Sequence, residues 1–169
     1  TVKPGTVRVL TGCAAVFTIG HGLDDWAARL AQEAGVKRTL VTDAGVPLRR
    51  GYHEHHGDGH ARSQSAAHDA VDPHYWLSIP NAIRLVQFIA EILAQLDPVS
   101  QAEYQQRAAT YQEQLRRADD EIRGLLSALP RRDIATFHMA FAYFAEAYGL
   151  NVVAVFEPAP GKEPGPRHV

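Results

Sequence analysis

The regular spacing of apolar residues between positions 104 and 129 constrains the fold more than any other feature of this sequence. Alternating steps of four and three separate Tyr104, Ala108, Tyr111, Leu115, Ala118, Ile122, Leu125 and Leu129. This 3.5-residue repeat predicts one continuous helix of roughly 38 Å, at about 1.5 Å per residue, ended by Pro130. Either a second chain in a coiled coil or the rest of the same molecule must cover its apolar stripe.

Strand–helix–strand patterns stand on both sides of this helix. Before it, residues 14–19 and 38–42 predict short strands, with a helix at 23–34 between them. A further helix begins near Pro80. After the long helix, residues 134–137 and 151–156 predict strands around a helix that covers residues 141–148. We therefore expect an α/β fold with two small βαβ-type lobes bridged by a long α-helix, each lobe having too few strands for a complete sheet.

Residues 46–70 show no apolar periodicity and predict a surface loop rich in His, Gly, Ser and Asp. Four of its histidines lie within one short stretch: His53, His55, His56 and His60. The segment from His53 to His68 lacks large apolar anchors, so little burial offsets the entropy lost on ordering. We expect it to be poorly ordered without a bound metal ion.

Composition narrows the classes of function. A net charge of -2 argues against a surface for nucleic acid. Cys13 is the only cysteine, so neither an intramolecular disulfide nor a thiolate zinc cluster can form within this sequence. Because no apolar run reaches the roughly 18–20 residues of a membrane span, we expect no direct membrane insertion of this chain. We recognise no signal peptide after Thr1.

His74 and His138 are the candidate metal ligands. Neutral imidazole binds Zn²⁺ well, and three histidines with a carboxylate or water complete a tetrahedral site. Sequence spacing alone favours ordinary core or surface histidines. However, His74 lies between Pro73 and Trp76, on a restricted turn. His138 follows a predicted strand, where ligands gather in α/β folds, and both histidines have aromatic neighbours that can exclude water.

Four motifs carry a resemblance to a known family. Residues 72–77 (DPHYWL) with Asn81-Ala82 resemble D-P-H-x-W-L-D-P-x-N-A, although Ser78-Ile79 replace the second D-P. Residues 137–144 (FHMAFAYF) with 148–150 (YGL) resemble F-H-x-A-F-x-Y-F followed by Y-G-L. Residues 20–26 (GHGLDDW) resemble N-G-x-G-L-E-x-W, and residues 160–164 (PGKEP) resemble a P-G-x-E-P turn. The chain thus resembles the ZnuA/TroA-like family, the zinc and manganese solute-binding proteins of bacterial ABC importers.

The resemblance implies a function and a site. His74 and His138 would be two of the metal ligands, and histidine at position 138, where manganese binders often carry Glu, favours Zn²⁺ over Mn²⁺. The protein would capture zinc in the cleft between the lobes, in the periplasm or as a cell-surface lipoprotein, and deliver it to a membrane ABC permease. The loop histidines would form a low-affinity zinc site; a solvated polar loop is the alternative.

Two other functions compete with zinc import. A zinc hydrolase would need an open metal position and a general base, but the sequence contains neither an H-E-x-x-H segment nor a nucleophile-elbow motif, so we expect no enzyme. The other alternative is an adhesin-like interaction protein or a degraded paralogue that binds metal only weakly.

The resemblance also predicts the domain organisation. Residues 1–97 would form the N-terminal lobe, including the His-rich loop at 52–68, residues 98–130 the linker helix, and residues 131–169 the start of the C-terminal lobe. The helix becomes a rigid connector rather than a coiled coil. The family's other ligands would lie before Thr1 and after Val169, so the chain would be the middle of such a protein. We expect weaker zinc binding than in a complete relative, falling below pH about 6.5 as imidazole is protonated.

Overall fold

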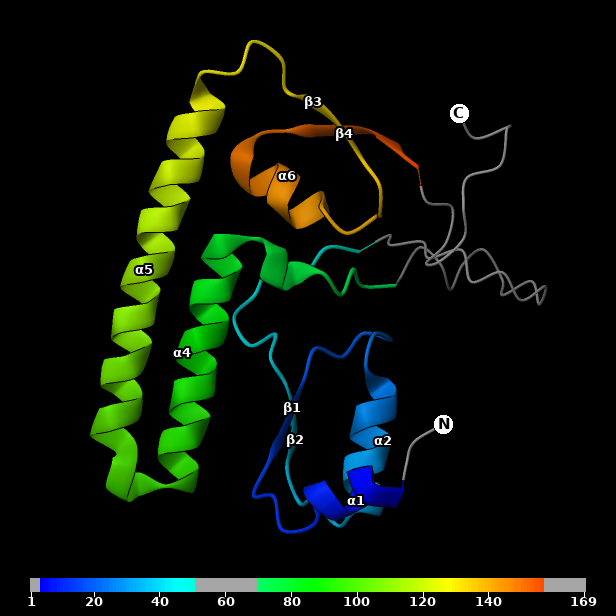
Figure 1. The fold of residues 1–169 in the computed structure, drawn as a ribbon, viewed down its shortest axis with the longest axis vertical. Coiled ribbons are helices and arrows are strands. Elements are labelled where there is room, and N and C mark those ends of the chain that lie inside the picture. Colours follow the sequence, from blue (N-terminus) through cyan, green and yellow to red (C-terminus); the bar gives the residue numbers. More distant parts are fainter. Residues whose placement is uncertain (1–3, 51–69, 157–169) are drawn as a thin grey trace, which may run out of the picture.

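The computed structural model describes residues 4–50 and 70–156 of the 169-residue chain (Figure 1). The helices and strands in chain order are α1 (Pro4–Leu10), β1 (Val16–Thr18), α2 (Asp25–Glu33), β2 (Thr39–Val41), the 3₁₀ turn η1 (Tyr75–Leu77), α4 (Ile79–Leu96), the 3₁₀ turn η2 (Pro98–Ser100), α5 (Gln101–Ser127), β3 (Asp133–Thr136), α6 (Ala142–Tyr148) and β4 (Asn151–Val155). Every predicted strand and helix is present, while α1 was not predicted.

The first lobe is a βαβ unit in which β1 pairs in parallel with β2. The turn from β1 into α2 is tight, because Gly20 has φ 75° and a Cβ there would lie 2.9 Å from Val41 Cγ1. The Asp24 carboxylate accepts hydrogen bonds from the backbone N–H groups of Ile19 and Gly20 at 2.8 and 2.6 Å. This closes the turn beside the positive end of α2.

The second lobe repeats the pattern, with β3 parallel to β4 and α6 between them in sequence. Gly149 ends α6 in the left-handed conformation at φ 65°, and the Leu150 N–H donates to the Ala145 carbonyl at 2.8 Å. Tyr148 and Leu150 pack with Ile122 of α5. The predicted α/β class with two small βαβ units is confirmed.

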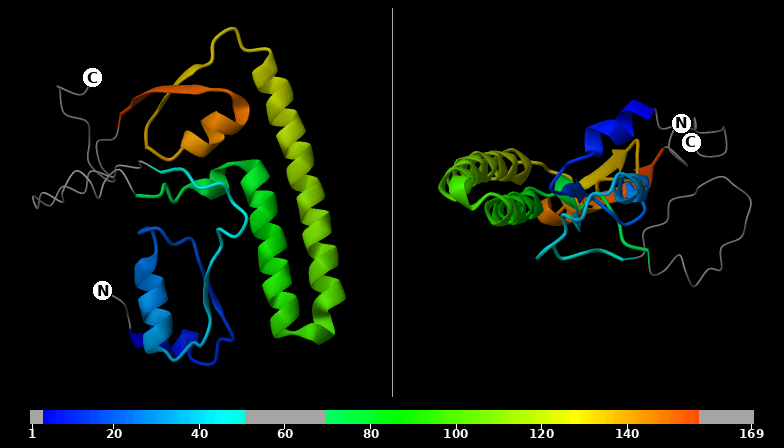
Figure 2. Two further views of the ribbon diagram at one scale, coloured as in Figure 1. Left: turned by 180° about the vertical axis from the view of Figure 1, so that it is seen from behind. Right: turned by 90° about the horizontal axis from the view of Figure 1, so that it is seen from below.

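Helices α4 and α5 form an antiparallel hairpin that runs beside both lobes (Figures 1 and 2). Asp97 holds the connecting turn, because its side chain accepts hydrogen bonds from the Ser100 N–H and the Tyr104 hydroxyl. Midway along the pair, the Gln112 amide donates to the Ile83 carbonyl at 3.0 Å. The predicted continuous helix is confirmed, and α4 of the same chain packs along it.

The apolar stripe predicts the buried face of α5 only in part. Ala108 is buried and Ile122 packs on the second lobe, but Tyr111 and Leu125 are 51% and 68% exposed and Leu129 is exposed beyond the helix end. Gln112 and Leu126 occupy the inner positions instead. A straight helix drifts by about 20° per heptad from a strict 3.5-residue repeat, so an uncoiled helix turns part of the stripe outward.

Helix α4 is, in the part of the chain that the structure describes, one helix with the length and composition of a membrane span. It qualifies by average hydropathy, whereas the expectation concerned an unbroken apolar run, which polar residues of α4 interrupt. The helix contains Arg84 and Glu91 and packs along α5. Because the core helices of globular proteins pass the same test, this is weak evidence for insertion.

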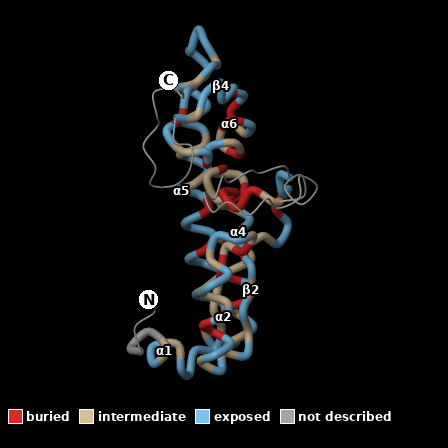
Figure 3. The backbone as a smooth tube through the Cα atoms, turned by 90° about the vertical axis from the view of Figure 1, so that its right-hand side faces the viewer, coloured by how far each residue is buried: buried red, intermediate tan, exposed pale blue. Residues whose placement is uncertain are grey.

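The core lies where the first lobe, the start of α4 and α6 meet. The side chain of Tyr75 is fully buried and packs with Val46, Leu85 and Tyr143. Figure 3 shows buried backbone positions concentrated in this central region. The Tyr75 hydroxyl donates to the Ile19 carbonyl at 2.8 Å and lies 2.9 Å from Thr42 Oγ1. The residue directly after His74 is therefore anchored to the ends of both strands of the first lobe.

The burial of Tyr75 predicts a loss of stability at alkaline pH. Desolvation raises the pKa of the Tyr75 phenol from 10.0 to about 12. As pH rises, the phenol loses its proton at a lower pH in the unfolded chain than in the folded one. The stability contributed by the protonated Tyr75 is therefore complete below pH 10 and is lost as pH rises towards 12. At about 1.4 kcal/mol per pKa unit, the free energy of unfolding should fall by roughly 2–3 kcal/mol across this window. Urea unfolding of wild type and Tyr75→Phe between pH 8 and 12 measures it; equal losses in both proteins would contradict it.

Candidate metal site

His74 lies in the short segment that leads from Val71 into η1. The segment begins with an isolated antiparallel bridge between Arg50 and Val71 and leads into η1. His74 is 5% exposed, and its Nδ1 atom lies 2.8 Å from Asp72 Oδ1, which also accepts the His74 backbone N–H at 2.9 Å. An ionised carboxylate only accepts hydrogen bonds, so Nδ1 carries the ring proton and Nε2 is the nitrogen suited to a metal ion.

His138 lies in the turn between β3 and α6, at the strand-to-helix junction that the sequence predicted. Its carbonyl accepts the Ala140 N–H at 2.9 Å, which holds the turn. The residue is half-buried. Its position at the carboxyl end of a parallel strand is where ligand-binding side chains gather in α/β folds.

The fold brings these two histidines together from different lobes. Their ring centroids lie 5.4 Å apart, with ring planes at 81°. The His74 ring also lies 5.4 Å from the centroid of a ring of Trp76. This separation brings the two imidazoles into the range expected for ligands of one Zn²⁺ ion, whose bonds to imidazole nitrogen are about 2.0–2.1 Å long.

The pair is not joined by a third ligand within the described residues. Across residues 4–50 and 70–156, no group of three or more His, Cys, Asp and Glu side chains is placed to hold a metal ion. The loop residues His53, His55, His56 and His60 lie outside the described residues, as does the predicted disorder of their loop. The described part alone supplies two imidazoles and an orienting carboxylate.

Aromatic shielding of the pair is asymmetric. Trp76 is half-buried beside His74, as expected. By contrast, the neighbours Phe137 and Met139 of His138 are 62% and 40% exposed. His138 itself is half-buried, so the two histidines differ in how far their sequence neighbours are covered.

Comparison with protein families matches residues 1–169 to the family described as "ZnuA: Zinc-uptake complex component A periplasmic". The chain belongs to this ZnuA family. It is 32% identical over 146 residues to the zinc-binding lipoprotein AdcA of Streptococcus pneumoniae TIGR4, covering 85% of this chain and 29% of AdcA. It is 25% identical to the manganese-binding lipoprotein MntA of Halalkalibacterium halodurans, covering 91% of this chain and 47% of MntA.

Solved structures agree with the fold. A crystal structure of ZnuA superposes with a TM-score of 0.80 at 27% identity, covering 99% of this chain and 61% of that chain. The solute-binding protein FpvC of Pseudomonas aeruginosa, in complex with Mn²⁺, superposes with a TM-score of 0.77 at 30% identity. This match covers 99% of this chain and 59% of the FpvC chain. The chain therefore spans 29% of AdcA and 61% of the solved ZnuA.

Two residues support the histidine pair without having been predicted as site residues. Asp72 orients His74, as the outer carboxylate does in carboxylate–histidine–zinc arrangements. The Tyr143 hydroxyl donates to the Asp72 carbonyl at 3.0 Å and accepts the Arg49 N–H at 2.8 Å. The Asp-x-His spacing of residues 72–74 could have indicated the first role, whereas the second needs the tertiary structure.

His21 pairs with a different carboxylate and lies outside the His74–His138 pair. Its Nε2 atom lies 2.9 Å from Asp43 Oδ2, and its ring stands edge-on to Tyr75 at 6.1 Å between centroids. His168 lies outside the described residues. The His21–Asp43 pair thus offers an internal control for the His74–Asp72 pair.

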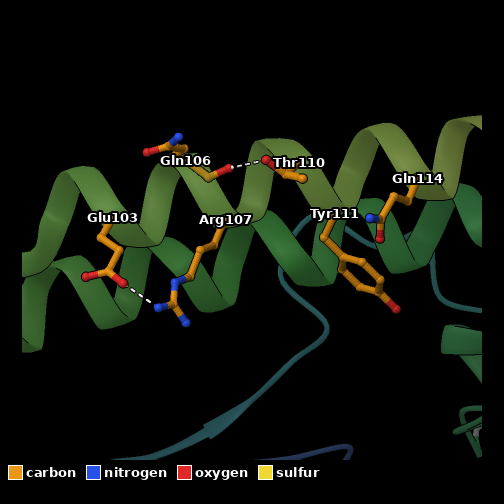
Figure 4. A pocket seen from close by; sticks show the side chains of 6 residues that line it. All are labelled: Glu103, Gln106, Arg107, Thr110, Tyr111 and Gln114. Atoms are coloured by element: carbon orange, nitrogen blue, oxygen red, sulfur yellow. Dashed lines mark hydrogen bonds and ion pairs between the residues drawn. The ribbon is translucent and has the colours of Figure 1, made fainter.

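A shallow hollow elsewhere on this ZnuA-family chain follows the outer face of α5 (Figure 4). Its lining is polar except for Tyr111. Glu103 forms an ion pair with Arg107, and the Thr110 hydroxyl donates to the Gln106 carbonyl at 3.0 Å. These are ordinary contacts between neighbouring turns of one helix. The hollow does not include the histidine pair.

Proposed function

We propose that the protein is the zinc receptor of an ABC importer, which captures Zn²⁺ between its lobes with His74 and His138 and delivers it to a membrane permease. The observation that carries the proposal is the meeting of two imidazoles from different lobes, 5.4 Å apart between ring centroids. A site made by two lobes can be opened and closed by their relative movement, which suits capture followed by release.

Zinc is the proposed cargo, with manganese less favoured. Imidazole is a borderline ligand that suits Zn²⁺, whereas Mn²⁺ prefers oxygen ligands. AdcA is named as a zinc-binding lipoprotein, and MntA and FpvC are the relatives whose names or structures specify manganese. The loop residues His53, His55, His56 and His60 remain proposed low-affinity zinc ligands.

The proposed location is outside the cytoplasm, in the periplasm or at the cell surface. The family description contains the word periplasmic, and AdcA and MntA are both named lipoproteins. The proposed role is transport without catalysis. We also propose the domain division into lobes at 1–97 and 131–169 with a connector at 98–130, which is supported by the packing of α5 on α4 and on the second lobe.

Zinc titration of the purified protein and matched variants tests the proposal. His74→Ala removes a proposed ligand, and we expect the zinc affinity to fall at least tenfold, on the order of the loss caused by disturbing a single metal-site residue. His21→Ala removes an imidazole that is also bonded to a carboxylate but lies outside the pair, and should leave the affinity unchanged. Absence of zinc binding in the wild type, or equal losses in both variants, would overturn the proposal.

A further inference from the structure

We infer that Tyr143 is a positioning residue for metal capture, whose hydroxyl ties the helix after His138 to the segment that holds His74. The inference rests on the proposed function and extends it to a residue that cannot itself be a strong zinc ligand. It explains what holds two histidines from different lobes together in the arrangement that the structure shows.

The Tyr143 hydroxyl bridges two backbone segments of the first lobe. It donates to the Asp72 carbonyl at 3.0 Å and accepts the Arg49 N–H at 2.8 Å. The two segments are bonded to each other, because the Asp72 N–H donates to the Arg49 carbonyl at 3.0 Å. Burial raises the pKa of the Tyr143 phenol above its ordinary value, despite the opposing hydrogen bond from Arg49, so the hydroxyl keeps the proton that it donates.

Both proposed ligands lie close in sequence to residues of this bridge. On one side, the carbonyl that Tyr143 contacts belongs to Asp72, whose carboxylate orients the His74 ring. On the other side, Tyr143 lies in the first turn of α6, shortly after the His138 turn. Figure 1 shows α6 beside the segment that leads into α4. A shift of α6 relative to Asp72 would therefore change the separation of the two imidazoles.

The hydroxyl, rather than the ring, makes this polar connection. The Tyr143 side chain packs with Val46, Tyr75 and Leu85, and phenylalanine would keep that apolar contact. Arg49 and Glu146 form an ion pair between the same two parts of the molecule, but their side chains are 43% and 63% exposed. Exposed ion pairs contribute little, so the buried hydroxyl is the stronger link.

A two-lobe site needs such a link because the described part supplies only two imidazoles. Ligands held on separate elements must be within about 0.5 Å of the binding geometry to keep their affinity. Without the hydroxyl, part of the free energy of metal binding would go into ordering α6 against the first lobe. The expected consequence is weaker zinc binding with an intact fold.

The test compares two buried tyrosines of α6 in the whole protein by calorimetric zinc titration. Tyr143→Phe removes the bridge to Asp72 and Arg49, and zinc affinity should fall roughly three- to tenfold, as expected for the loss of one or two hydrogen bonds. Tyr148→Phe is the control, because the Tyr148 hydroxyl donates to Asp119 of α5 at 2.7 Å, away from the pair. Its zinc affinity should equal that of the wild type.

Two further measurements separate positioning from general stability. The visible absorption of bound Co²⁺ reports ligand geometry and should change in Tyr143→Phe but not in Tyr148→Phe. Should Tyr143→Phe fail to fold, Arg49→Pro and Arg49→Ala replace it: both lose the guanidinium group, but only proline also loses the N–H that the Tyr143 hydroxyl accepts. Zinc affinity should fall further in Arg49→Pro.

The outcomes distinguish this inference from the proposed function. If the wild type binds zinc, His74→Ala loses it and Tyr143→Phe does not, the positioning role is overturned and the receptor function stands. Equal losses in both tyrosine variants, or an unchanged Co²⁺ spectrum in Tyr143→Phe, also overturn the positioning role. A wild type that binds no zinc overturns both.

Discussion

Replacing His138 by alanine is expected to remove most zinc binding at the His74–His138 pair. The described residues bring two imidazoles together at 5.4 Å between centroids, with no third His, Cys, Asp or Glu side chain to complete a group. Loss of one imidazole leaves a single nitrogen ligand from this part of the chain, and Zn²⁺ sites in proteins require three or four. The affinity should fall by at least roughly 100-fold, the upper end of the losses seen when only a supporting residue is disturbed.

Deletion of residues 52–60 is the matched comparison for His138→Ala. The deletion removes four proposed loop ligands, His53, His55, His56 and His60, and should leave the high-affinity titration step largely intact. Calorimetric zinc titrations of the two variants, with melting curves to verify folding, decide between the sites. If the deletion abolishes binding and His138→Ala does not, the loop is the zinc site and the cleft assignment fails.

Replacing Asp72 by asparagine should lower zinc affinity by roughly 10–100-fold, the usual effect of disturbing the outer partner of a ligating histidine. The Asp72 carboxylate is buried and accepts two N–H groups of His74, from the backbone at 2.9 Å and from the ring at 2.8 Å. Asparagine has nearly the same shape but no negative charge, and its amide group can also turn a donor towards the ring. The His74 ring would then be held less firmly with Nε2 towards the ion.

Asp43→Asn is the control for this second prediction. Asp43 pairs with His21 at 2.9 Å, so the variant removes the same charge from a similar carboxylate–histidine pair outside the candidate site. Competition with a zinc-chelating dye measures both affinities. Equal affinities for wild type and Asp72→Asn would show that Asp72 has no role in orienting the ligand, even if His74 itself binds zinc.

Local patterns were sufficient for the fold class and for every helix and strand in the described residues except α1. Short apolar runs predicted β1 and β2, and the helical spacing and Gly149 predicted α6 and its end. These predictions succeed because strands and helices bury one face with a period set by backbone geometry. The motif around His74 and the motif around His138 also indicated the family, since each is contained in a short stretch.

The same patterns could not determine which face of α5 is buried. The 3.5-residue repeat included Tyr111 and Leu125, which are exposed, whereas Gln112 is buried and donates to the Ile83 carbonyl. Whether a helix follows a 3.5- or a 3.6-residue period depends on whether it supercoils with its partner. That partner is α4, and its position is a property of the tertiary structure.

By itself, then, the sequence determined two βαβ units, a long helix and two candidate histidines in recognisable motifs. Only the tertiary structure decided that the rings of His74 and His138 meet at 5.4 Å, that Asp72 orients His74, and that Tyr143 joins Asp72 to the second lobe. The physical reason is that local periodicity specifies how a segment folds, whereas the separation of side chains from different lobes depends on how the packed core and the α4–α5 hairpin place those lobes.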